Sequence, residues 1–159
     1  MIPDLQSLAG KLEVERQAIT GLVQGLDDAT LDRPGPDGAW SVRETLAHIV
    51  ASEEGLLSLA QRIARGENPQ PRPDYNLDDA NAREVDKRRG LHVPALLDEW
   101  QRHRAEWAVF LESVTPEQLG LQGAHPRFEQ QVTLLQLVIV MLKHERNHKQ
   151  EIMSLLSEC

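Results

Sequence analysis

The sequence predicts an all-α protein, a four-helix bundle, and three observations support this. Apolar residues recur at helical spacing in four long segments. Stretches rich in proline and glycine separate these segments. No stretch alternates apolar and polar residues for long enough to predict a strand. A chain of 159 residues is expected to form one domain over residues 1–159.

The first predicted helix runs from about Pro3 to Leu26, with leucine and isoleucine residues along one side. It ends where the stretch LDRPGPDGAW supplies prolines and glycines. The second helix is expected to begin at Ser41, because Ser41 and Glu44 have the spacing of a capping box. Its apolar stripe continues to near Gly66.

A turn-rich loop, GENPQPRPDYN, follows, and then a charged segment, residues 77–90, with only a weak helical stripe. A long helix is predicted from about Pro94, with Trp100 and Trp107 on one side. The last helix is expected to open near Thr133 with a second capping box, TLLQ, and to run almost to the end. The irregular stretch before it includes GAHPRFEQQ, which has no assigned role.

Composition excludes several classes of function. The formal net charge of −8 argues against a nucleic-acid partner, which requires a basic surface. No apolar run is long enough for a membrane span, and the N-terminus lacks the pattern of a secretory signal. The only cysteine, Cys159, is the last residue, so no internal disulfide can form. We therefore expect a cytoplasmic protein with no membrane partner.

The last helix contains the pattern H-E-x-x-H, formed by His144, Glu145 and His148. The two histidines lie in the apolar stripe of this helix, one turn apart, on the same face as Met141. Two imidazoles on one apolar face are costly to bury unless each has a partner. A shared metal ion is the simplest such partner.

The surrounding sequence does not fit two known uses of this pattern. A zinc protease of the extended type needs glycine and histidine where Glu151 and Ser154 stand. A di-iron bundle needs a second Glu-x-x-His motif, and the chain has none. A third ligand must then come from upstream, and the residues alone leave four candidates open: His48, His92, His103 and His125.

Two segments, WSVRETLAHI at residues 40–49 and HERNHKQEI at residues 144–152, resemble the DinB/YfiT-like superfamily of bacterial four-helix metal-binding proteins. The resemblance implies that His48, His144 and His148 hold one divalent metal between the second helix and the C-terminal helix. Three neutral imidazoles suit Zn²⁺ best, and Ni²⁺ or Fe²⁺ also accept them. Members of the superfamily often form homodimers, so we expect a homodimer here.

The superfamily includes transferases and isomerases that depend on low-molecular-weight thiols such as bacillithiol or mycothiol. The resemblance therefore implies that the metal activates such a thiol for attack on an electrophilic small-molecule substrate. Glu145 is the candidate catalytic base. Trp40, His103, Arg104 and Trp107 are candidate pocket residues. The alternative is a non-catalytic helical module that acts in a stress response and keeps a structural or vestigial metal site.

Overall fold

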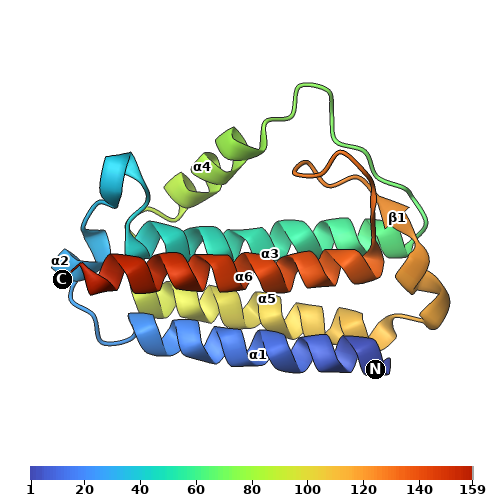
Figure 1. Ribbon diagram of the computed structural model, residues 1–159, viewed down its shortest axis with the longest axis horizontal. Coiled ribbons are helices and arrows are strands. Elements are labelled where there is room, and N and C mark those ends of the chain that lie inside the picture. The colour runs from blue at the N-terminus through green and yellow to red at the C-terminus, as the bar shows by residue number, and fades with distance from the viewer. Residues whose placement is uncertain (159) are drawn as a thin grey trace.

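The structure is a computed structural model that describes residues 1–158, so Cys159 lies outside the described residues. Four long helices form a bundle (Figure 1). They are α1 (Pro3–Val23), α3 (Val42–Ala64), α5 (Val93–Ser113) and α6 (Leu134–Ser157). The predicted four-helix architecture is therefore confirmed. Among the described residues no helix is both long enough and apolar enough to cross a membrane.

Shorter elements connect the long helices. They are α2 (Asp28–Asp32), a 3-10 turn η1 (Pro36–Gly38), α4 (Leu77–Lys87), a second 3-10 turn η2 (Pro116–Gly120), and strands β1 (Gln122–Gly123) and β2 (Val132–Thr133). The two strands pair antiparallel, with Gln122 opposite Thr133. Each strand has only two residues, which is too short to give an alternating pattern in the sequence.

Both predicted capping boxes are present and fix the starts of α3 and α6, the two helices that carry His48, His144 and His148. At α3 the backbone N–H of Ser41 donates to Glu44 Oε2 at 2.9 Å, and the N–H of Glu44 donates to Ser41 Oγ at 3.2 Å. At α6 the same exchange joins Thr133 and Gln136, at 2.8 and 3.1 Å. Each pair satisfies donors that the first turn of a helix would otherwise leave free.

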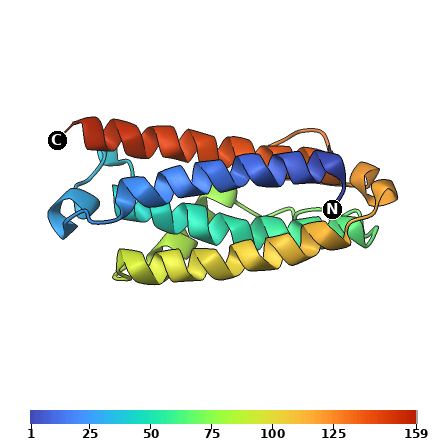
Figure 2. The same cartoon turned by 90° about the horizontal axis from the view of Figure 1, so that it is seen from below.

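The order of the helices around the bundle places α3 next to α6. Helix α1 packs against α6 and α5, and α3 packs against α5 and α6. Figures 1 and 2 show α1 and α6 running in one direction and α3 and α5 in the other. Helix α4 lies on the outer side of α3. Two helices far apart in the sequence, α3 and α6, thus share an antiparallel interface.

A buried polar layer divides the apolar core into two halves. One half is lined by residues such as Leu12, Leu56 and Met141, and the other by residues such as Ile19, Leu46 and Ile152. Between them lie four buried polar side chains, one from each long helix: Arg16, Glu53, His103 and Glu145.

Arg16 is the centre of this layer. Its Nη2 lies 2.8 Å from Glu53 Oε1, and its Nε donates to Glu145 Oε1 at 3.3 Å. Trp100 Nε1 also donates to Glu53 Oε1, at 2.5 Å. Burial raises the pKa of Glu145 well above its usual value; the Arg16 charge opposes this rise and the nearby Glu53 carboxyl adds to it.

Replacing Arg16 with methionine should leave two buried carboxyl groups without their cation. We expect Arg16→Met to lower the free energy of unfolding by about 3–5 kcal/mol, as when one partner of a buried ion pair is removed. Arg102→Met, at an exposed position of α5, is the matched control and should change stability by less than about 0.5 kcal/mol. Urea unfolding monitored by circular dichroism measures both. Equal effects of the two substitutions would contradict a central role for Arg16.

Candidate metal centre

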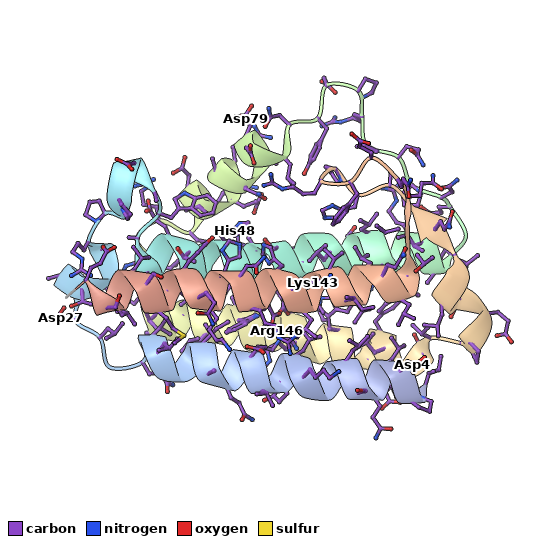
Figure 3. The ribbon with its side chains drawn as sticks, in the orientation of Figure 1. Asp4, Asp27, His48, Asp79, Lys143 and Arg146 are labelled. Carbon is purple, nitrogen blue, oxygen red and sulfur yellow. The ribbon has the colours of Figure 1, made fainter. Side chains whose placement is uncertain are left out.

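The structure brings His48, His144 and His148 together where α3 and α6 meet, and Figure 3 labels His48 at this position. His48 Nε2 lies 2.9 Å from His144 Nε2, and His148 Nε2 lies 3.0 Å from the same atom. His48 is buried, whereas His144 and His148 are partly exposed. The structure thus brings together the three histidines that the family resemblance indicated as ligands.

A shared metal ion accounts for the positions of the three ring nitrogens better than hydrogen bonds among the rings do. His144 Nε2 lies within hydrogen-bonding distance of two ring nitrogens, yet it has either one proton or one lone pair to offer. Nitrogen ligands about 2.0–2.1 Å from one Zn²⁺ lie roughly 2.8–3.4 Å apart, by the geometry of right-angled to tetrahedral coordination. The two short separations are within this range.

Neighbouring side chains orient the rings with Nε2 toward the centre. His148 Nδ1 lies 2.6 Å from Glu151 Oε2, so this carboxylate can accept its proton. The Trp40 ring packs on His48, with ring centroids 4.8 Å apart and the planes tilted by 40°. A partner on the second ring nitrogen fixes the tautomer that a metal needs. Glu151 was not predicted, although an acidic residue three positions after a ligand histidine is a detectable signal.

The environment keeps two of the histidines neutral. Burial, together with the charge of His148 and of Arg127, lowers the pKa of His48 to about 3. Burial, together with the charges of His148, His48, His125 and Arg127, lowers the pKa of His144 to about 2. Metals bind the neutral form of imidazole, so these two ligands need no deprotonation at neutral pH.

The structure places Glu145 away from this centre. It follows His144 directly in the chain, but its side chain is buried in the core and contacts Arg16 of α1. The structure therefore places the candidate catalytic base Glu145 outside the cluster of three histidines, as a buried partner of Arg16. The histidines and the glutamate of the motif H-E-x-x-H lie on two different faces of one helix, because successive residues point about 100° apart around the helix axis.

The three predicted pocket residues on α5 also belong to the bundle interior. His103 Nδ1 contacts the Val50 carbonyl oxygen at 3.0 Å, and Trp107 Nε1 donates to the Glu53 carbonyl oxygen at 3.0 Å. Arg104 forms an ion pair with Glu13 of α1. These contacts join α5 to α3 and α1, and the structure does not bring His103, Arg104 or Trp107 into the cluster of three histidines. The apolar stripe that suggested a pocket marks the core.

Removing one of the three histidines should abolish metal binding. We expect about one equivalent of divalent metal in the untagged protein and less than about a tenth of that in His48→Ala, measured by inductively coupled plasma mass spectrometry. His103→Gln is the matched control, because it removes a buried histidine outside the cluster, and it should keep the metal. Metal retained in His48→Ala but lost in His103→Gln would contradict the assignment.

The lowered pKa of His48 predicts how the metal-free protein responds to acid. The unfolded chain binds a proton at this histidine below about pH 6.5, while the folded chain stays neutral down to about pH 3. Stability should therefore fall as the pH drops below 6.5, by about 2 kcal/mol for this group at pH 5. Urea unfolding of the metal-free protein, carried out well above pH 6.5 and again at pH 5, measures this loss in the free energy of unfolding. An equal loss in His48→Gln would contradict a neutral, buried His48.

The family model of the DinB superfamily matches residues 11–152. A relative from Bacillus pumilus (strain SAFR-032), named as a candidate metal-dependent hydrolase, is 25% identical over 140 residues, which cover 88% of this chain and 78% of the relative.

Three solved structures share the fold. YfiT from Bacillus subtilis, described as a candidate metal-dependent hydrolase with an unusual four-helix bundle topology, has a TM-score of 0.82 at 22% identity and covers 96% of this chain and 86% of its own. A mycothiol-dependent maleylpyruvate isomerase has a TM-score of 0.76 at 14% identity, over 93% of this chain and 60% of its own. The colibactin self-resistance protein ClbS, in complex with double-stranded DNA, has a TM-score of 0.75 at 12% identity, and the match covers 100% of this chain and 99% of ClbS.

The match to the family model confirms the resemblance drawn from residues 40–49 and 144–152. It spans most of the sequence and includes all three histidines of the cluster. The chain belongs to the DinB superfamily.

Proposed function

We propose that this protein is a metal-dependent transferase that activates a low-molecular-weight thiol for attack on an electrophilic small molecule. The observation that carries the proposal is the clustering of three imidazoles between α3 and α6, with their ligand atoms within 4.8 Å of one another. A divalent metal in this site would lower the pKa of a bound thiol or water, so that a nucleophile is available at neutral pH. Zn²⁺ remains the metal we expect.

A cavity of about 640 Å³ lies at the N-terminal part of α3, and none of the three histidines is among its lining residues. It is bounded on α3 by Ser41, Glu44 and Ala47, and on the facing segment by Val85 and Arg88. Glu44 stands four residues before His48, so the cavity reaches to within one helical turn of this ligand. Its volume is in the range of sites that bind small molecules.

The exposure of the cluster favours an enzyme over the non-catalytic module. A structural metal site is closed by protein ligands and packing, whereas a catalytic site keeps an open position. Here His144 and His148 are partly exposed, and the neighbours that contact the three rings include the polar side chain of Glu151. An open side of this kind would admit a thiol and its reaction partner.

The names of the similar proteins favour one alternative activity, hydrolysis. Two of them are described as candidate metal-dependent hydrolases, and a third is a mycothiol-dependent isomerase. The same three histidines would support either reaction, since a metal activates water as well as a thiol. The proposal of a transferase therefore requires a test that separates thiol from water as the nucleophile. A homodimer and the absence of a nucleic-acid partner stay predictions.

The metal-loaded protein should accelerate the reaction of a thiol with a chromogenic electrophile such as 1-chloro-2,4-dinitrobenzene. Bacillithiol, mycothiol, cysteine and glutathione are compared as cosubstrates. We expect His144→Ala to lose at least about 100-fold in rate, because the centre loses a ligand. Glu145→Gln should stay within about threefold of the wild type, whereas loss of a general base would cost 100-fold or more.

Three results would contradict the proposal in different ways. Turnover of activated esters without any thiol would identify a hydrolase. No turnover of either kind by protein that holds a full equivalent of metal would favour the non-catalytic module. A large loss of rate in Glu145→Gln would restore Glu145 as a catalytic residue.

A further inference from the structure

The loop between β1 and β2, residues 124–131, lies over the face of the bundle that carries the three histidines (Figure 1). Both of its ends are anchored to the segment that follows α3. The backbone N–H of Ala124 donates to the Pro69 carbonyl oxygen at 2.9 Å, and Gln131 Nε2 donates to Asn68 Oδ1 at 2.7 Å. The loop thus holds a defined position near the metal centre.

Arg127 stands in this loop, and its position is set from two sides. Its backbone N–H donates to His125 Nδ1 at 3.1 Å, and its Nη2 donates to Asp78 Oδ1 of α4 at 2.9 Å. The Arg127 and Asp78 side chains are 57% and 78% exposed, so this ion pair is solvated and contributes little. A guanidinium group has five N–H donors, and an incoming anion can take up those that Asp78 does not use.

The Arg127–Asp78 ion pair joins this loop to α4, and Figure 3 labels His48 below both of these segments. The three ligand histidines carry no negative charge, and Glu151 is the carboxylate that contacts one of them. With a divalent cation bound, the region between the centre and Arg127 would be strongly positive and would attract an anionic ligand.

We propose that Arg127 binds a carboxylate group of the small molecule that enters the metal centre, so that the site selects ligands bearing a carboxylate. A planar guanidinium fork pairs with a carboxylate through two parallel hydrogen bonds, and the ligand displaces Asp78 from one of them. Arg127 is thus a specificity-determining residue. This inference rests on the proposed transferase function only in taking a thiol as the nucleophile. Recognition of the carboxylate by Arg127 does not depend on that function.

The test measures binding to the Co²⁺-loaded protein by its visible and near-ultraviolet absorption. The ligands are mercaptocarboxylates from mercaptoacetate to 6-mercaptohexanoate, each paired with the mercaptoalcohol of the same length. Simple carboxylates without a thiol form a third series. In the wild type we expect at least one chain length at which the mercaptocarboxylate binds about tenfold or more tightly than its alcohol partner.

Two substitutions of opposite effect make the test specific to Arg127. Arg127→Gln should remove the preference for the carboxylate and leave the affinity for the mercaptoalcohols unchanged. Asp78→Asn frees Arg127 from its ion pair and should strengthen carboxylate binding by up to about fivefold, the amount that an exposed ion pair is worth. Arg102→Gln removes an equal charge from an exposed site on α5 and should leave every affinity within about twofold.

The outcomes separate this inference from the proposed function. One outcome is that thiols bind, but Arg127→Gln changes the affinities for the mercaptocarboxylate and the mercaptoalcohol of each pair equally, or changes neither. The inference on Arg127 is then overturned and the transferase proposal stands. If no thiol perturbs the Co²⁺ spectrum but simple carboxylates do so in an Arg127-dependent way, the transferase proposal fails and the inference stands. If no ligand binds to the Co²⁺-loaded wild type, both are overturned.

Discussion

The buried contact of Arg16 with Glu53 and Glu145 is the constraint on which the metal centre depends. It ties α1 to α3 and α6 at the middle of the bundle, where charged groups are tolerated only with partners. Glu53 is five residues beyond His48, and Glu145 is one residue beyond His144. The contact with Arg16 therefore sets the height of α3 against α6, and with it the approach of the three histidines.

Helix α6 explains why a protease-like motif occurs in this fold. Its inward face presents Glu145 to the polar layer, while the face toward α3 presents His144 and His148 to His48. The glutamate and the histidines are adjacent in sequence but serve separate purposes, one in stability and the other in metal binding. The sequence pattern alone combines them into one site, because it contains no information about which neighbour each face of the helix contacts.

The long helices, both capping boxes and the facing pair of histidines on α6 were predictable because they follow from local spacing. His48 was not predictable in this way, since it lies at the edge of its stripe, and only the family resemblance indicated it. Glu53 and Arg16 interrupt apolar stripes at core positions, a signal that sequence reasoning missed. The stripe through His103 and Trp107 was interpreted as a pocket because periodicity distinguishes buried from exposed, and does not distinguish a packed core from a cavity.

The most direct test of the central claim is a crystal structure of the untagged protein with anomalous scattering recorded at the absorption edge of its metal. We predict one anomalous peak between α3 and α6, bonded to the Nε2 atoms of His48, His144 and His148 at about 2.0–2.2 Å, with at least one further position open to solvent. A metal bonded to Glu145, or one bonded to fewer than these three histidines, would contradict the assignment of the site.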